Sequence, residues 1–576
     1  MTLLSTISIP RALGAAVVFF LSRTVITKAI SIYSTVRAFN KSVTPYAGIL
    51  WLHPFRSVAL VSGPWFPSRS HIGSFYKTFA PYKNRGSTAV ASVLFRNSIP
   101  TIWLADPQGI QTVAGEAVLF QKDIDAYGAL NFYGQNLIGV EGSDWRRHRK
   151  VAKSAFNETG NAFVWAETIR AVNEWFAHLD AAQVHEKQPI IVDAAKDLLQ
   201  LALIVISSAG FGRRASWTQN ASTVAPPGHL MAFGPAVFAA VDHLHTKVLT
   251  PGWLYTLSER FDIPVVGRVV RDTVYAYEAL QRHIMELVSL SRAWVVEGKV
   301  ASMDAGLLRN LVEANMALQD DEDAPKGSPN AFKSLTEDEL LSNSFAFLLA
   351  GHETTAHSLS FAVGFLALHP EAQRKIYEEA LLLWPDGTPT SASTSSYKEC
   401  MPKLPYTTAV FHETIRLFPA VVRLSKLVHA DATIPAQRFT TNASGKVDLD
   451  SIRDTTVHVK TGSMVMLDIF ALHQNPICWG PDATEFKPER FIDTESYRWP
   501  RDAFVAFSAG PRNCIGQRFA LTESVCFLAS LVRTYEISVP ATLRGKSFEE
   551  QKRVMLDWTP GVTMVPNNCV VSLTRR

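Results

Sequence analysis

A long pattern of mostly apolar positions near the middle of the chain predicts a buried helix. Thr336 followed by Glu339 forms a capping box, which predicts where this helix begins. The apolar stretch over residues 340–370 ("LLSNSFAFLLAGHETTAHSLSFAVGFLALHP") ends at a proline. Strand-like segments are fewer, and residues 456–470 ("TVHVKTGSMVMLDIF") are the clearest of them. The chain is therefore expected to be mainly α, with small β-sheets.

Three polar, turn-rich stretches interrupt the apolar patterns, at residues 319–330, 385–396 and 440–451. Their composition is typical of surface loops. No internal repeat is visible in the sequence. We expect these loops to interrupt one fold and not to separate domains.

The N-terminus carries an apolar run over residues 12–22 ("ALGAAVVFFLS"), which is shorter than the roughly 20 apolar residues of a spanning helix. A cleaved signal peptide would share this short apolar core, but no cleavage site in a polar context follows it. Three cations follow the run: Lys28, Arg37 and Lys41. By the positive-inside rule, the bulk of the chain is expected to face the cytoplasm. We expect residues 1–60 to form an N-terminal membrane anchor and linker before a domain at 61–576; an ordinary buried helix is the alternative.

The composition narrows the class of function. Hydrophobic residues make up 47% of the 576 residues and charged residues 19%, which suits a protein that contacts lipid or holds an apolar ligand. The net charge of +4 is too small to indicate nucleic-acid binding. The five cysteines are scattered and odd in number, which argues against a disulfide framework and for a reducing compartment.

One cysteine lies in an unusual segment, "FSAGPRNCIG" at residues 507–516. A lone cysteine cannot form a four-ligand zinc site, but a single thiolate can hold haem iron from one side. Gly510 and Gly516 would allow a tight turn and the close approach of a flat macrocycle. The residues after Cys514 have a helical pattern, so the start of that helix would direct N–H groups at the sulfur and favour its ionised form. A buried structural cysteine is the alternative.

The five residues Phe507, Gly510, Arg512, Cys514 and Gly516 match FxxGxRxCxG, the haem-binding signature of the cytochrome P450 family. The chain resembles this family over most of its length. The resemblance implies a single-domain cytochrome P450 fold that binds heme b (iron protoporphyrin IX), with Cys514 as the axial ligand of the iron. It also implies that Phe507 packs under the loop, that Gly516 lies against the haem and that Arg512 pairs with a propionate.

A segment of the long apolar helix, "AGHETT" (350–355), resembles the oxygen-binding motif of the same family. The resemblance implies that Thr354 offers its hydroxyl to dioxygen and that Glu353 connects the site to a proton source. It also implies that Gly351 lets the helix bulge there, and that His352 occupies a variable position. Polar side chains within so apolar a helix need hydrogen-bond partners. This argues against the alternative that they only lie on the helix surface without a role.

Two further sets of residues match family motifs. Trp145 and Arg149, in "WRRHRK", resemble the WxxxR pattern and are expected to bind haem propionates, as is Lys426 by its place after the ExxR helix. Glu413 and Arg416 match ExxR in "HETIRLFP". With Arg490 of "FKPERF" they are expected to form a buried network whose role is structural.

A basic cluster surrounds the WxxxR segment: Arg146, Arg147, Lys150 and Lys153. A solvated helix face would explain such a run. The family resemblance gives it a second explanation, because the face near the cysteine loop would dock an acidic electron donor, NADPH-cytochrome P450 reductase or cytochrome b5.

The resemblance implies a haem-thiolate monooxygenase of the fungal, endoplasmic-reticulum type that oxidises a hydrophobic small molecule. Terpenoids, polyketides, fatty acids and xenobiotics all fit, and secondary metabolism is a common setting. Apolar segments expected at the substrate are 131–139, 229–241, Phe347, Ala350, 420–423 and 559–563. The alternatives are reductase-independent isomerase, dehydratase or peroxygenase chemistry, and a haem protein that only sequesters ligands.

Overall fold

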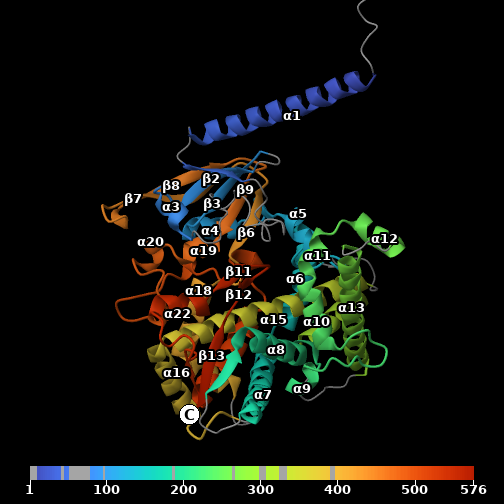
Figure 1. Ribbon diagram of the computed structural model, residues 1–576, viewed down its shortest axis with the longest axis vertical. Helices are drawn as coiled ribbons and strands as arrows, with labels where there is room; N and C mark the ends of the chain where they lie inside the picture. Colours follow the sequence, from blue (N-terminus) through green and yellow to red (C-terminus); the bar gives the residue numbers. More distant parts are fainter. Residues whose placement is uncertain are drawn as a thin grey trace, which may run out of the picture. The chain divides into compact units, whose positions relative to one another are not determined.

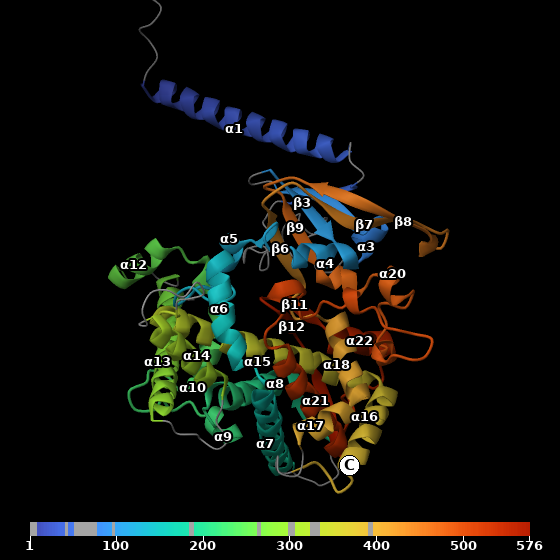
Figure 2. The same cartoon turned by 180° about the vertical axis from the view of Figure 1, so that it is seen from behind.

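The structure, a computed structural model, describes residues 9–40, 44–50, 78–94, 98–183, 189–261, 266–297, 306–322, 334–389 and 396–576. These residues form two compact units that alternate along the sequence (Figures 1 and 2). Unit 1 comprises Met1–Lys122 and Arg423–Pro481, and unit 2 comprises Asp123–Val422 and Asp482–Arg576. The expected boundary at residue 60 and most of the expected loop at 319–330 lie outside the described residues.

Unit 1 contains a six-stranded sheet with the order β1-β2-β3-β9-β6-β4. Its strands are β1 (Tyr46–Leu50), β2 (Ala89–Leu94), β3 (Ile99–Leu104), β4 (Phe120–Lys122), β6 (Arg423–Val428) and β9 (Met464–Asp468). The pairs β1–β2 and β3–β9 are parallel, and the others are antiparallel. Figure 1 shows the N-terminal strands in blue beside β6 and β9 in orange, so the sheet joins segments more than 300 residues apart in the sequence.

The same unit contains short helices and a long hairpin. The helices are α3 (Ala80–Lys83), α4 (Pro107–Gly115), α19 (Ile469–His473) and α20 (Pro476–Trp479). The hairpin consists of β7 (Ala432–Thr441) and β8 (Val447–Val459). The prediction of a loop at 440–451 is therefore wrong in extent, because only residues 442–446 form the turn. In this turn Asn442 Oδ1 accepts hydrogen bonds from the N–H groups of Ser444 and Lys446. The strand expectation at 456–470 is confirmed by the end of β8 and by β9.

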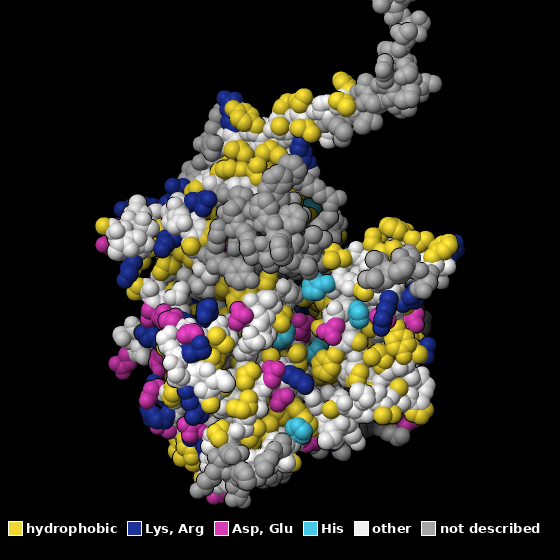
Figure 3. Space-filling view, in the orientation of Figure 1, with side chains coloured by type: hydrophobic (Ala, Val, Ile, Leu, Met, Phe, Trp, Pro, Cys, Tyr) yellow, Lys and Arg dark blue, Asp and Glu magenta, His cyan; other side chains and the backbone are white. Residues whose placement is uncertain are grey.

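The N-terminal helix α1 (Ile9–Asn40) exposes large apolar side chains. Val18, Phe19, Phe20, Val25, Ile26, Ile30 and Tyr33 are all more than half exposed, and yellow side chains mark the described part of this helix in Figure 3. Among the helices of the described residues, none combines the length and the apolar character needed to cross a membrane.

Unit 2 is predominantly helical. Its longer helices are α6 (Gly142–Ala155), α7 (Glu158–Ala182), α8 (Ala194–Val205), α10 (Phe233–Asp242), α12 (Gly252–Arg260), α13 (Val266–Val296), α14 (Leu307–Glu322), α15 (Glu337–Leu368), α16 (Pro370–Leu383), α18 (Pro405–Leu417), α21 (Gln517–Thr534) and α22 (Phe548–Met555). Shorter helices are α5 (Ile124–Tyr127), α9 (Trp217–Asn220), α11 (Leu244–Leu249) and α17 (Tyr397–Cys400). A three-stranded sheet combines β5 (Ile190–Asp193), β13 (Val570–Arg575) and β10 (Tyr535–Ser538), and a small hairpin combines β11 (Trp558–Pro560) and β12 (Met564–Pro566).

Helix α15 is the central element of unit 2, and it packs against α8, α18 and β12 (Figures 1 and 2). The expected capping box is present: Glu339 N–H donates to Thr336 Oγ1, and Thr336 N–H donates to Glu339 Oε2. Most of its side chains are buried, which explains the near-continuous apolar sequence. The mainly helical expectation, including the position of this helix, is confirmed.

The helix bulge expected at Gly351 is not present. Helix α15 runs without a break through this position. A Cβ atom at Gly351 would lie 3.0 Å from Ile206 Cδ1, so the glycine makes room for that side chain. Ile206 begins a π-helical turn, Ile206–Gly210, directly after α8. The irregular backbone near the oxygen-binding motif is thus in the neighbouring segment and not in α15 itself.

Candidate functional site

The segment around Cys514 forms a tight loop that leads into α21. Cys514 N–H donates to Phe507 O over 2.8 Å, which closes the loop between two of the motif residues. Gly510 has a φ of +66°, in the left-handed region that favours glycine. Gly516 does not, and a Cβ there would meet only Phe156 at 3.7 Å and Cys514 Sγ at 4.0 Å. Backbone conformation therefore explains the glycine at 510, whereas neither conformation nor packing within the chain explains the one at 516.

The Cys514 side chain is exposed, although it lies deep enough among protein atoms that burial raises the pKa of its thiol. A hydrogen bond from the Gly516 N–H and the positive charge of Arg149 act in the opposite direction without overcoming burial. The expected ionising surroundings are thus present, but they do not ionise a free thiol by themselves. A bound metal ion would have to supply the remaining stabilisation of the thiolate.

Two arginines flank this loop. Arg149 of α6 donates to Asn513 O over 3.2 Å and to Asn513 Oδ1 over 2.9 Å, which joins α6 to the loop. Arg512 forms a 2.6 Å ion pair with Glu141, and its guanidinium carbon lies 4.8 Å from the centre of the Trp145 ring. Burial lowers the pKa of Arg512, against the attraction of Glu141. The structure therefore brings together Trp145, Arg149, Arg512 and Cys514, as expected.

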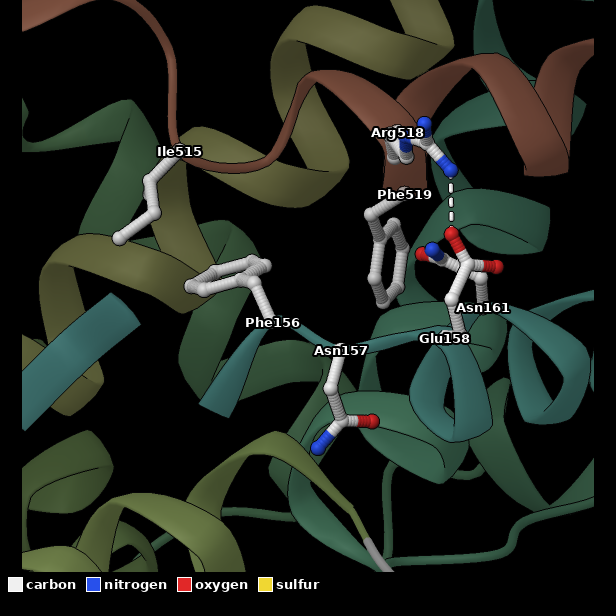
Figure 4. A pocket seen from close by; sticks show the side chains of 7 residues that line it. All are labelled: Phe156, Asn157, Glu158, Asn161, Ile515, Arg518 and Phe519. Carbon is white, nitrogen blue, oxygen red and sulfur yellow. Dashed lines mark hydrogen bonds and ion pairs between the residues drawn. The ribbon is translucent and has the colours of Figure 1, made fainter. Parts of the chain in front are cut away.

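A pocket of about 240 Å³ adjoins the loop, between the start of α7 and the start of α21 (Figure 4). Its lining residues are Phe156, Asn157, Glu158, Asn161, Ile515, Arg518 and Phe519. Arg518 forms an ion pair with Glu158 across it. The Phe156 ring also packs edge-on against Phe347 of α15, at 5.8 Å between ring centres. Phe156 thus connects the cysteine loop with α15, and no motif in the sequence marks it.

The acid and the alcohol of "AGHETT" have different surroundings. Thr354 Oγ1–H donates to Ala350 O over 2.6 Å, and both residues keep accessible surface on a helix that is mostly buried. Glu353 is buried, and this burial raises its pKa, while a hydrogen bond from the Thr563 hydroxyl to its Oε1 at 2.9 Å acts in the opposite direction. Glu353 is therefore a buried acid with a raised pKa, beside an accessible hydroxyl.

The structure brings Glu413, Arg416 and Arg490 together in a buried network. Arg416 donates to both carboxylate oxygens of Glu413, over 2.6 and 2.8 Å, and to Ala483 O over 2.7 Å. Arg490 Nε lies 3.5 Å from Glu413 Oε1, whereas its Nη2 pairs with Asp482 at 2.6 Å. Asp482 is a member of the network that the sequence motifs did not reveal. The ion pair fixes the segment at 482–490 on α18.

Helices α6 and α15 are joined by a second buried ion pair. Arg147 donates to Glu339 through two bonds of 2.6 Å, and His148 Nε2 lies 3.4 Å from the same carboxylate. Although burial acts to raise it, the bonds from Arg147 and from the Thr336 N–H lower the pKa of Glu339 to about 2. Arg147 therefore points inward, and only Arg146, Lys150 and Lys153 of the expected basic cluster are exposed.

Arg147→Ala is expected to lower the free energy of unfolding at pH 7 by about 3 kcal/mol, because it leaves a buried carboxylate without its cation. The pKa of Glu339 is about 2 in the folded chain against 4.5 for a free glutamate, so the pair stabilises the fold above pH 4.5, and this contribution disappears as the pH falls through 2. Urea unfolding at several pH values should show wild type and variant converging in acid.

Arg374→Ala is the matched control, because Arg374 pairs on the surface with Glu371 and Glu378. It is expected to leave the urea midpoint unchanged. Equal midpoints for wild type and Arg147→Ala at pH 7 would contradict the structural role of this pair.

Lys426 lies apart from these residues in the sequence and belongs to unit 1. It is a buried residue of β6, where it pairs with Val465 of β9 and with Lys122 of β4. Its expected contact with a haem propionate stays a prediction.

Comparison with known proteins shows a similarity that covers most of the chain and not only the motifs. The Cytochrome P450 family model matches residues 77–444 and 446–564. Cytochrome P450 monooxygenase 124 of Postia placenta is 34% identical, over 84% of this chain and 85% of its own length. Cytochrome P450 monooxygenase AOL_s00215g278 of Arthrobotrys oligospora is 27% identical, over 76% of this chain and 75% of its own. The phomenoic acid biosynthesis cluster cytochrome P450 monooxygenase of Leptosphaeria maculans is 24% identical, over 82% and 80%. The chain therefore belongs to the cytochrome P450 family, as one of its monooxygenases.

Proposed function

We propose that this monooxygenase inserts one oxygen atom from O2 into a hydrophobic small molecule, with electrons from an NADPH-dependent reductase. The observation that carries the proposal is the combination of the Cys514 loop with an acid–alcohol pair on one compact unit. An accessible hydroxyl beside a buried acid with a raised pKa suits proton delivery to a bound oxidant. A ligand-sequestering protein would have no need of that pair.

The family implies a haem with a thiolate on its iron, and the residues here fit that group. Arg512 Nε is buried and has no hydrogen-bond partner among the described residues, so an acidic group at this place would find an unused donor. Arg149 and Trp145 lie beside it. We propose heme b, which Cys514 would hold through its iron and Trp145, Arg149 and Arg512 through its propionates, with Phe507 and Gly516 beside the bound group. When bound, it supplies the reduction of O2 and the oxidation of substrate.

The residues of the chain then have separate tasks in the reaction. The Gly516 N–H and Arg149 stabilise negative charge on the Cys514 sulfur. The Glu353 carboxyl holds a proton more strongly than a free glutamate, and so can act as a proton reservoir. Thr354 presents its hydroxyl on the accessible stripe of α15 that it shares with Ala350.

The remaining basic residues of α6 support a reductase partner. Arg146, Lys150 and Lys153 are exposed at spacings of four and three residues, which places them on one helix face. Arg149, on the same helix, contacts the residue directly before Cys514. An acidic electron donor, such as NADPH-cytochrome P450 reductase or cytochrome b5, would be steered to this face by charge.

Residues of α1 support association with a membrane. Its exposed apolar side chains would be unfavourable in water over such a length, and a lipid surface would cover them. We propose attachment to the endoplasmic reticulum membrane, with the remainder of the chain in the cytoplasm. A lipophilic substrate such as a terpenoid, polyketide, fatty acid or xenobiotic would partition into the same membrane. The name of the Leptosphaeria relative favours secondary metabolism.

The test is product formation under ¹⁸O2 by the full chain in membranes that contain the reductase. We expect products from a lipophilic substrate library to gain one ¹⁸O atom, with turnover that depends on NADPH and on the reductase, because one oxygen atom enters the substrate. Turnover without NADPH and reductase would favour isomerase, dehydratase or peroxygenase chemistry. Tight binding of lipophilic compounds without any product would favour sequestration.

A further inference from the structure

Three buried polar side chains form a hydrogen-bonded row between α15 and the turn before β12. Glu353 and His357 are four residues apart, so they lie on the same face of α15. Thr563 lies in the turn that joins β11 to β12. Its hydroxyl is 2.9 Å from Glu353 Oε1 and 2.9 Å from His357 Nδ1. All three residues are buried, which makes an unmade hydrogen bond costly here.

The direction of these bonds follows from the number of protons. The Thr563 hydroxyl has one hydrogen, and it donates this hydrogen to Glu353 Oε1. The contact with His357 then requires Nδ1–H of the imidazole to donate to Thr563 Oγ1. Burial lowers the pKa of His357 to about 4, so the ring is neutral at pH 7 and this tautomer can persist. The row therefore runs from His357 through Thr563 to Glu353.

Thr563 is the one hydrogen-bond partner of the Glu353 carboxyl among the described residues. The neighbouring alcohol Thr354 does not hydrogen-bond to it, because its hydroxyl donates to Ala350 O. A glutamate side chain has several rotamers, and the bond from Thr563 favours the one that places Oε1 beside its hydroxyl. The orientation of the acid thus depends on a residue 210 positions away in the sequence.

The turn that carries Thr563 is itself held firmly. Gly561 N–H donates to Thr563 O over 2.9 Å, and Met564 N–H donates to Ala420 O over 3.0 Å. A Cβ at Gly561 would lie 2.9 Å from Val565 Cγ2, so the turn has no space for a larger residue there. Residues 559–563 are also among those expected to contact substrate. The same turn therefore reaches both the acid and the expected substrate region.

We propose that Thr563 and His357 are positioning residues that hold the Glu353 carboxyl for proton delivery, and that Thr563 links the substrate-facing turn to this acid. The inference rests on the proposed monooxygenase function. Thr563 fixes one carboxylate oxygen, and His357 fixes the hydroxyl rotor of Thr563. Loss of either group would leave the acid in place but free to adopt other rotamers.

The experiment compares Thr563→Val, which removes the hydroxyl at nearly constant shape, with Thr563→Ser, which retains it. His357→Leu and His357→Asn form a second pair, because the asparagine amide can still donate from near the Nδ1 position. Thr168→Val is the matched control: Thr168 is also buried, and its hydroxyl donates to Val164 O within α7. Each variant is prepared as the haem-loaded full chain.

Two measurements are made. The first is the infrared carboxyl band of Glu353 in the resting protein, assigned by its loss in Glu353→Gln. The second is product formed per NADPH consumed, with hydrogen peroxide as the uncoupled product. Thr563→Val and His357→Leu are expected to shift or broaden the band and to lower product per NADPH roughly tenfold, because an unoriented acid delivers protons poorly. Thr563→Ser, His357→Asn and Thr168→Val are expected to remain close to wild type in both.

An unchanged carboxyl band in Thr563→Val would overturn the proposal, as would full coupling in that variant. Failure of Thr563→Ser to restore the band would show that the shape of the side chain matters and its hydroxyl does not, which also overturns it. Failure of the monooxygenase proposal is distinguishable, because wild type itself would then form no NADPH-dependent product, while the infrared comparison would still report on the position of Glu353.

Discussion

Cys514→Ala is expected to abolish the red-shifted Soret band that the reduced protein gives with carbon monoxide, together with all product formation. That band requires a thiolate on the iron, and the sulfur of Cys514 is the one that accepts the Gly516 N–H and lies in the field of Arg149. Burial raises the pKa of the Cys514 thiol, so the free group keeps its proton. Binding of the sulfur to a metal ion displaces this proton and leaves a thiolate. The spectrum therefore tests the ligand directly, independently of any substrate.

The matched control is Cys526→Ala, twelve residues later. Cys526 is fully buried in a cluster with Trp165, Cys400 and Val525, and its thiol faces Trp165 O at 3.8 Å. This variant is expected to lose some stability, as a buried sulfur is replaced by a smaller group, and to keep the red-shifted band. A red-shifted band in Cys514→Ala, or its absence in a folded, haem-containing Cys526→Ala, would show that Cys514 is not the ligand.

Arg416→Met is expected to have the largest effect on folding, a loss of about 3–5 kcal/mol. Both Arg416 and Glu413 are fully buried, and the methionine would remove the bidentate pair as well as the bond to Ala483 O. The uncompensated Glu413 would have to take up a proton or move toward water, since burial already raises its pKa. We expect a low yield of haem-loaded protein and a lower midpoint in urea unfolding.

Two further variants test whether burial of the lone charge causes the loss of stability in Arg416→Met. Arg292→Met removes an exposed pair with Glu337 and is expected to cost less than about 1 kcal/mol. The double variant Glu413→Leu/Arg416→Met removes both charges and is expected to recover part of the lost stability, because no lone charge remains buried. An Arg416→Met protein as stable as wild type would show that the network is dispensable for the fold.

Local signals predicted a large part of the fold and of the site. The capping box at Thr336 and Glu339 marked the start of α15 because both partners lie within one turn of helix. The three-residue spacing of Glu413 and Arg416 likewise predicted a contact within α18. The helix after Cys514 followed from its apolar pattern and begins at Gln517. Each of these interactions is decided by neighbours in the sequence.

What the sequence did not reveal depends on contacts between distant segments. No local pattern distinguishes inward Arg147 from outward Arg146, because the decision depends on Glu339, 192 residues away. Thr563 lay in a segment expected to contact substrate, and only its place in the fold reveals the bond to Glu353. The polar stretch at 440–451 resembled a loop because both strands of that hairpin expose many side chains, which hides their alternation.

The contacts of the Glu339 carboxylate help to fix the rotation of α15 about its own axis. The Oε2 atom of Glu339 accepts the N–H of Thr336, which closes the cap of the helix, and also accepts a hydrogen bond from Arg147 of α6, so both contacts oppose sliding or rotation of the helix at this end. Successive residues of an α-helix are about 100° apart, and a slip of one residue would turn every later side chain by that amount. Glu353 lies fourteen residues further on and faces within about 40° of the same direction. The contacts of Glu339, about 21 Å away along the helix axis, therefore help to set the direction in which Glu353 points.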